Sequence, residues 1–153
     1  MSENAGPLSD LRVVEVASFV AVPAAGALLA DLGAQVTKVE VPAGEIYRKG
    51  RPLFQGYESD FPESPGFQMD NRGKRSIALD MKQPEALEVT QKMAAECDVV
   101  VEAFRPGVMA KFGLSYDDVK KVNPNVIYLS VTGFGQEGPN NGLPVTDAII
   151  QAY

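Results

Sequence analysis

The most constraining feature of the sequence is an alternation between short β-branched runs and segments with helical spacing of apolar residues. Five runs have the composition of buried strands, at 11–17, 35–41, 76–80, 98–102 and 125–132. Helical segments separate most of them, at about 23–33, 84–96, 106–113 and from 115 onward. Because parallel strands need long connections that cross the sheet, this order favours a parallel arrangement. The sequence therefore predicts an α/β fold, with a Rossmann-like open, mostly parallel sheet and flanking helices.

Proline and glycine mark the ends of the expected helices. Pro23 and Pro84 stand in first turns, where a missing N–H costs no hydrogen bond, and Gly33 follows the first helix. A final helix begins near Asp147, which is well placed to cap it, and stops after two turns at Tyr153. A helix this short is not stable in isolation. We therefore expect residues 1–153 to be the N-terminal part of a larger domain.

One long segment lacks a clear period. Residues 42–73 contain many glycines and prolines with charges of both signs, and we expect them to be irregular. Loops of this length in a compact domain are usually functional. We therefore expect this segment to help shape a ligand site.

Composition excludes several classes of protein. The 153 residues carry a net charge of -6 with scattered Lys and Arg, which disfavours nucleic-acid binding. No apolar stretch approaches the roughly 20 residues that span a bilayer, and the polar, acidic N-terminus does not resemble a signal peptide. The single cysteine, Cys97, excludes an intrachain disulfide and is expected to be a small, semi-buried residue. These features predict a cytoplasmic protein without a membrane partner.

The absence of histidine limits the chemistry further. It excludes a Ser-His-Asp triad, a Cys-His dyad and a histidine metal site within these residues, so no metal is expected. A dinucleotide site needs G-x-G-x-x-G after the first strand, but residues 17–26 read ASFVAVPAAG. The bare match at 133–138 lies in a glycine-rich loop, and no Walker A motif is present. The sequence therefore predicts no NAD site.

Ligands of open α/β sheets bind outside the carboxyl ends of the strands. Residues 18–23, 41–44, 103–107 and 133–138 follow such ends. Helices that begin there present free backbone N–H groups, which favour anions. Lys82, Arg105 and Lys111 stand nearby. Each of these cations is either a phosphate contact or a solvated surface residue, and the sequence leaves both readings open.

Four ordered segments carry a family resemblance. The first is 7–14 with 29–40, and the others are 71–82, 101–109, and 133–139 with Pro144, Asp147 and Gln151. These segments resemble signatures of the family III CoA-transferases, a group that includes formyl-CoA:oxalate CoA-transferase, carnitine CoA-transferases and α-methylacyl-CoA racemase. Together they cover nearly the whole chain.

The resemblance implies transfer of CoA between carboxylic acids. An aspartate attacks the acyl-CoA thioester to form a mixed anhydride, and the CoA thiolate then forms an aspartyl thioester. Acyl-CoA is the substrate, a carboxylic acid is the acceptor, and no tightly bound cofactor is expected. Members form interlocked homodimers when full length. The nucleophilic aspartate is expected beyond Tyr153, so these residues alone are expected to be inactive.

The resemblance also implies contacts for individual residues. The match places Phe19, Val20 and Ala21 at the adenine end of the CoA site. Further CoA-binding positions come from the second and third signatures, namely Leu79, Lys82, Ala103, Phe104, Arg105 and Lys111. The family usually has asparagine at position 103, so alanine there removes an amide. Phe104 either packs against the ligand or belongs to the core.

Two adjacent residues bear on the reaction. Asp147 matches an acidic position near the active site of relatives and is expected to be an auxiliary catalytic residue or a helix cap, two compatible roles. Thr146 stands where the racemases carry an acid/base histidine, which disfavours α-methylacyl-CoA epimerisation. The alternatives to CoA transfer are that epimerisation and a non-catalytic CoA-binding fragment.

Overall fold

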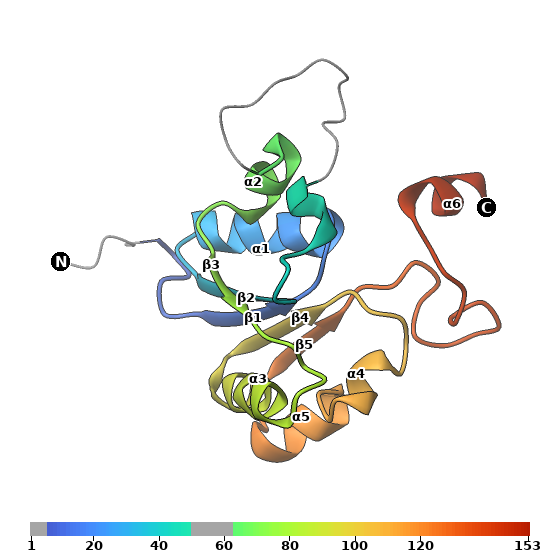
Figure 1. Ribbon diagram of the computed structural model, residues 1–153. Coiled ribbons are helices and arrows are strands. Elements are labelled where there is room, and N and C mark those ends of the chain that lie inside the picture. The colour runs from blue at the N-terminus through green and yellow to red at the C-terminus, as the bar shows by residue number, and fades with distance from the viewer. Residues whose placement is uncertain (1–5, 50–62) are drawn as a thin grey trace.

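A computed structural model describes residues 6–49 and 63–153 of the chain (Figure 1). Five strands form one all-parallel sheet in the order β3-β2-β1-β4-β5. The strands are β1 (Arg12–Val16), β2 (Gln35–Glu40), β3 (Arg75–Ala78), β4 (Val99–Glu102) and β5 (Ile127–Ser130). Their ends differ from the predicted ones by a residue or two, the usual uncertainty at element boundaries. The predicted α/β fold with a parallel sheet is confirmed.

Helices cover both faces of the sheet (Figure 1). One face carries α1 (Ala21–Asp31) and α2 (Pro65–Asn71), with the short 3-10 helix η1 (Ile46–Lys49) before α2. The opposite face carries α3 (Pro84–Glu96), α4 (Val108–Lys111) and α5 (Tyr116–Val122). The last helix, α6 (Asp147–Ala152), lies beside the two layers. No helix in the described part of the chain is long and apolar enough to cross a membrane.

Each face of the sheet has its own hydrophobic core, because successive side chains of a strand point to opposite faces. The core under α1 contains Val13, Ala17, Val22, Ala34, Val36, Val99 and Val101. The core under α3, α4 and α5 contains Val14, Val16, Val39, Ala94, Cys97, Val100, Met109, Leu114, Val119 and Val126. Burial raises the pKa of the Cys97 thiol to about 11, which keeps it protonated at neutral pH. Cys97 is thus more deeply buried than the semi-buried residue that the sequence predicted.

The prediction that residues 42–73 are irregular was wrong at both ends of the segment. The helix η1 lies in its first part and α2 closes it, while residues 50–62 fall outside the described range. Ser64 caps α2, since its hydroxyl accepts a hydrogen bond from the Phe67 N–H at 3.2 Å, and Pro65 is the first helical residue. Ser-Pro is a recognisable start signal that composition alone obscured.

Two other helix starts differ from the predicted ones. Helix α4 begins at Val108 rather than at Pro106, because Gly107 has a φ of 81° and cannot continue a right-handed helix. Helix α1 begins at Ala21, so Pro23 still lies in its first turn as expected.

Candidate functional site at the carboxyl edge of the sheet

The strand order reverses between β1 and β4. From β1 the sheet extends in two directions, since β2 and β3 follow on one side of β1 and β4 and β5 follow on the other. Val16 and Glu102 are register partners at the carboxyl ends of these two strands. The segments that follow them therefore leave the sheet side by side. Sheets of this order bind ligands in the crevice at this point.

Phe19 is the most unusual residue of the first segment. Its φ is 67°, it is the only non-glycine residue with a positive φ in the described ranges, and 56% of it is exposed. Its ring lies 6.3 Å from the Tyr47 ring, centroid to centroid. A left-handed backbone costs free energy in a bulky residue, and such residues gather at binding sites. An exposed aromatic ring thus stands at the predicted crevice.

The start of α1 lies directly after Phe19. Val20 is the residue before the first turn and makes no side-chain cap hydrogen bond, and both Val20 and Ala21 are exposed. The first N–H groups of a helix have no partner within it and carry a partial positive charge. The three predicted adenine-end residues therefore adjoin a group of N–H donors that suits an anion.

A buried carboxylate orders the segment after β4. Glu102 is 4% exposed, and its Oε2 accepts a hydrogen bond from the Phe104 N–H at 2.7 Å. Ala103 and Arg105 are exposed, while Phe104 packs partly buried against the core under α3. Phe104 therefore packs against this core while part of its surface stays exposed. Sequence reasoning missed Glu102, although a lone acid at the end of an apolar run is a signal for such a role.

The remaining predicted contacts come from the segment between β3 and α3 and from α4. Leu79 packs partly buried on the same core as Phe104, so the structure brings these two residues to one cluster. Lys82, Arg105 and Lys111 are all exposed, and none of them forms an ion pair with another described residue. Their charges are not neutralised by the described part of the chain.

The expectation that Asp147 caps α6 was wrong. Thr146 is the residue that precedes the helix, and its side chain makes no capping hydrogen bond. Asp147 is the first helical residue, is exposed, and accepts a hydrogen bond from the Gln151 side chain at 2.6 Å. A capping residue must lie just outside the helix, whereas Asp147 lies inside it. Figure 1 shows α6 apart from α1, to one side of the two layers.

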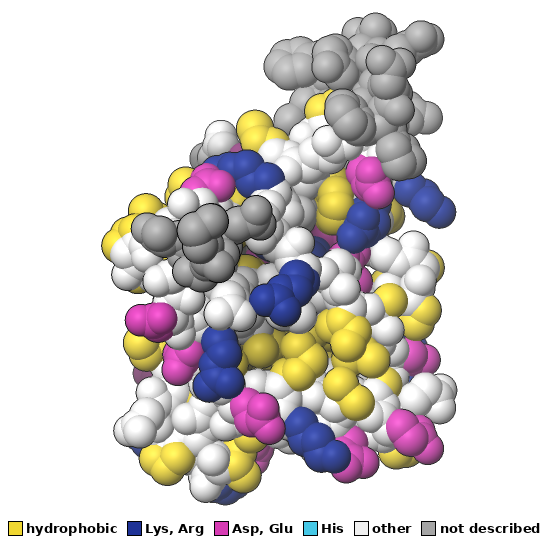
Figure 2. Space-filling view, turned by 90° about the vertical axis from the view of Figure 1, so that its left-hand side faces the viewer, with side chains coloured by type: hydrophobic (Ala, Val, Ile, Leu, Met, Phe, Trp, Pro, Cys, Tyr) yellow, Lys and Arg dark blue, Asp and Glu magenta, His cyan; other side chains and the backbone are white. Residues whose placement is uncertain are grey.

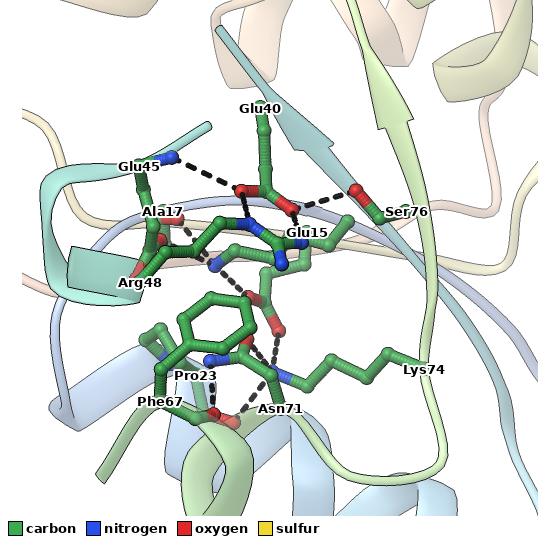
Figure 3. Close-up of polar contacts among 11 residues, drawn as sticks. Glu15, Ala17, Pro23, Glu40, Glu45, Arg48, Phe67, Asn71, Lys74 and Ser76 are labelled. Atoms are coloured by element: carbon green, nitrogen blue, oxygen red, sulfur yellow. Dashed lines mark hydrogen bonds and ion pairs between the residues drawn. The ribbon is translucent and has the colours of Figure 1, made fainter. Parts of the chain in front are cut away.

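A buried ion network, which sequence reasoning missed, lies beneath α1 (Figure 3). Its centre is the carboxylate of Glu15, on β1, whose side chain is fully buried. The Lys38 Nζ, on β2, lies 2.8 Å from the Glu15 Oε1 and 2.9 Å from the Glu45 Oε2. It also donates to the Ala17 carbonyl oxygen at 2.8 Å. The Lys38 ammonium therefore lies among two carboxylates and one backbone carbonyl.

A second lysine completes the network. The Lys74 Nζ lies 2.7 Å from the Glu15 Oε2 and donates to the Pro23 carbonyl oxygen at 2.7 Å and the Asn71 Oδ1 at 3.1 Å. Burial lowers the pKa of Lys74, and the charge of Glu15 opposes that effect. One carboxylate thus joins two ammonium groups, each of which also holds a backbone carbonyl near the start of α1.

Glu40 and Arg48 form the outer part of the network. Arg48 donates to both oxygens of Glu40, from Nε at 2.7 Å and Nη2 at 2.6 Å, and Ser76 donates at 2.6 Å. Burial alone would raise the pKa of Glu40, but these bonds and the Glu45 N–H outweigh it and lower the pKa to about 2. The guanidinium of Arg48 lies 4.1 Å from the centre of the Phe67 ring. These contacts tie β2, β3, η1 and α2 together.

An open pocket of about 350 Å³ adjoins this network. Its walls are Lys38, Glu40, Arg48, Glu63, Phe67, Gln68, Asn71, Arg72, Lys74, Arg75 and Ser76. No group of three or more His, Cys, Asp or Glu among the described residues is placed to hold a metal ion. Charges of both signs are interspersed over the face shown in Figure 2, with hydrophobic side chains between them.

Known proteins match the chain over nearly its whole length. The sequence profile of CoA-transferase family III matches residues 8–153. The succinate–glutarate CoA-transferase of Agrobacterium fabrum is 40% identical over 99% of this chain and 38% of its own. The human succinyl-CoA:glutarate CoA-transferase is 39% identical over 97% of this chain and 33% of its own.

Solved structures agree with the sequence matches. A CAIB/BAIF family protein from Brucella suis superposes with a TM-score of 0.87 at 43% identity, over 96% of this chain and 39% of its own. Rv3272 from M. tuberculosis gives a TM-score of 0.88 at 41% identity, over 98% of this chain and 41% of its own. The chain spans about two fifths of the length of such relatives, and it belongs to CoA-transferase family III.

Proposed function

We propose that this chain supplies the CoA-binding α/β unit of an enzyme that transfers CoA between carboxylic acids. The observation that carries the proposal is the carboxyl edge of the sheet at the β1–β4 reversal, where the strained, exposed Phe19 adjoins the uncapped start of α1. Membership in a family whose relatives are named CoA-transferases supports it.

The proposed contacts follow the shape of CoA. The adenine ring packs against Phe19, Val20 and Ala21, since exposed aromatic and aliphatic surface suits a flat base. The phosphates bind the positively charged side chains of Lys82, Arg105 and Lys111. They also accept hydrogen bonds from the free N–H groups at the start of α1. Leu79, Ala103 and Phe104 provide the apolar and backbone surface for the rest of the ligand.

The proposed chemistry uses an aspartate carboxylate as the nucleophile. That carboxylate adds to the thioester carbonyl, the C–S bond breaks, and the CoA thiolate leaves with a mixed anhydride in place. The thiolate then attacks the aspartyl carbonyl and releases the donor acid. The acceptor carboxylate repeats both steps in reverse and carries CoA away. In this scheme Asp147 is an auxiliary residue.

The proposal extends to partners and location. The acceptor is a carboxylic acid, the assembled enzyme is a homodimer, and no tightly bound cofactor takes part. A reducing compartment such as the cytoplasm suits the single, buried Cys97. Thr146 in place of a histidine argues against proton exchange at the α-carbon as the main activity.

CoA binding is the first test. Titration calorimetry of the intact protein with CoA should give saturable binding that weakens as salt rises, because phosphate contacts are electrostatic. Arg105→Gln and Lys111→Gln should each weaken binding severalfold. Lys92→Gln, on an exposed pair of α3, is the matched control and should change nothing. Equal binding by all four proteins would remove the proposed phosphate site.

Transfer itself is the second test. The intact protein should move CoA from succinyl-CoA to glutarate or to another member of a panel of acids, with the products separated by chromatography. Succinyl-CoA and glutarate are chosen because relatives are named for them. Hydrolysis of the thioester without any new acyl-CoA would contradict the proposed reaction.

A further inference from the structure

The loop that carries Phe19 is held at both ends by the buried ion network. The Lys38 ammonium binds the carbonyl of Ala17, which directly precedes the loop. The Lys74 ammonium binds the carbonyl of Pro23, in the first turn of α1. Both lysine side chains are almost completely buried and share the carboxylate of Glu15. Figure 3 shows the Lys74 side chain reaching towards the Glu15 carboxylate.

The charged groups of the network are packed closely against α1. A Cβ added to Gly26, on α1, would lie 2.1 Å from the Glu15 Oε2 and 3.2 Å from the Lys74 Nζ. Helix α1 therefore sits directly on the charged groups. Each ammonium makes two hydrogen bonds and one further close ion pair, so it cannot move away without losing several of these contacts.

This arrangement explains how the loop keeps a strained residue. A left-handed backbone at a non-glycine residue persists only where the surroundings over-determine it. Between the two bound carbonyls, the described residues of the loop contribute no buried side chain except Val22 to fix it. The two lysine-to-carbonyl bonds are the polar contacts that fix its ends.

We infer that Glu15, Lys38 and Lys74 are positioning residues, which pre-organise the 18–22 loop and the start of α1 for the nucleotide half of CoA. The inference rests on the proposed CoA-binding function and adds three residues to it that do not reach the ligand. Pre-organised loops bind more tightly because less conformational freedom is lost on binding. Loss of the network should therefore weaken nucleotide binding while the pantetheine half is unaffected.

A ligand-free experiment tests the positioning itself. Amide hydrogen exchange of a peptide covering 18–22 should be at least about tenfold faster in Lys74→Met than in the parent protein. The free energy that orders one loop residue corresponds to about a tenfold change in the equilibrium between the closed and open loop. The variant Lys92→Met is the control and should exchange at the parent rate. Unchanged exchange in a folded Lys74→Met protein would overturn the inference whether or not CoA binds.

A second variant guards against misfolding. Lys74→Met leaves the Glu15 carboxylate buried without this ion-pair partner. The double variant with Glu15→Gln and Lys74→Met removes both charges, and the Pro23 carbonyl still loses its hydrogen bond from Lys74. Its loop should also exchange faster than the control. A loop that remains protected in this folded double variant would show that the network only stabilises the fold.

Binding separates a positioning role from a structural one. In titration calorimetry, the double variant should bind phospho-ADP, the nucleotide half of CoA, about tenfold more weakly than the parent. Its affinity for pantetheine should match that of the parent. Equal loss for both halves would indicate general damage and overturn the inference. Failure of the parent protein to bind CoA at all would instead remove the proposed function, and the exchange result would still stand.

Discussion

Glu15 and Lys38 are register partners in β1 and β2, and their charged groups meet 2.8 Å apart with both side chains almost wholly inside the protein. Charged side chains are rare at fully buried positions of a parallel sheet. Their desolvation is offset only because each finds further partners, Lys74 for Glu15 and Glu45 for Lys38. This pairing links the core of the sheet to the loops at its carboxyl edge.

Removal of the Lys38 charge should be costly. Lys38→Met leaves the carboxylates of Glu15 and Glu45 without their shared ammonium, and we expect a loss of about 3–5 kcal/mol in the free energy of unfolding. Urea denaturation followed by circular dichroism measures it. Lys92→Met, which breaks an exposed pair with Glu88, should cost less than about 0.5 kcal/mol. Similar costs for the two variants would show that the buried network does not stabilise the fold.

Glu40 should give the protein a distinct acid sensitivity. Its folded-state pKa is about 2 against an ordinary value of 4.5, so its stabilising effect is complete above 4.5 and is lost as the pH falls towards 2. The effect amounts to at most about 3 kcal/mol. Glu40→Gln should lower the free energy of unfolding at neutral pH and flatten its dependence on pH in that window. A parent protein whose stability is flat between pH 4.5 and 2 would contradict the assigned contacts.

Gly26 should tolerate no side chain. A Cβ there would lie 2.1 Å from the Glu15 Oε2, so Gly26→Ala must displace the carboxylate or the helix, and we expect a loss of about 1–3 kcal/mol. This outcome reverses the usual gain from alanine within a helix. Gly142→Ala is the matched control, since no atom lies within 4 Å of its added Cβ. Thermal unfolding of both variants tests the prediction, which a stabilised Gly26→Ala protein would refute.

Phe19 should matter for binding rather than for stability. Asparagine tolerates a left-handed backbone, so Phe19→Asn should leave the free energy of unfolding within about 0.5 kcal/mol of the parent. Loss of the exposed ring should weaken CoA binding, because stacking on a base contributes about 1–3 kcal/mol. Titration calorimetry and urea denaturation of the same variant give the two values. A large loss of stability with unchanged binding would reverse the roles proposed for this residue.

The sequence predicted the fold well, because its signals are local. The β-branched runs gave all five strands, and the helical segments between them implied the parallel order. The ends of elements were predicted less well where a single backbone angle determines where a helix begins, as at Gly107 before α4. The ends of segment 42–73 were missed because many glycines and prolines outweighed the Ser64-Pro65 start signal.

The place of the candidate residues in the fold was predicted in part, and their role stays a prediction. The carboxyl-edge rule and the family resemblance placed Phe19, Ala103 and Arg105 at one edge of the sheet, and the strand order brings β1 and β4 together there. The ion network was not foreseen, because Glu15, Lys38 and Lys74 are far apart in the sequence and look like ordinary surface charges. Only the folded sheet shows that β1 and β2 bury Glu15 and Lys38, and that Lys74, just before β3, reaches the Glu15 carboxylate.

A crystal structure of the protein grown with CoA tests the central claim most directly. The account predicts an adenine ring against Phe19, Val20 and Ala21, with the diphosphate at the start of α1 and within reach of Arg105. CoA bound instead in the pocket lined by Arg48 and Arg75, or at the amino edge of the sheet, would contradict the proposed site.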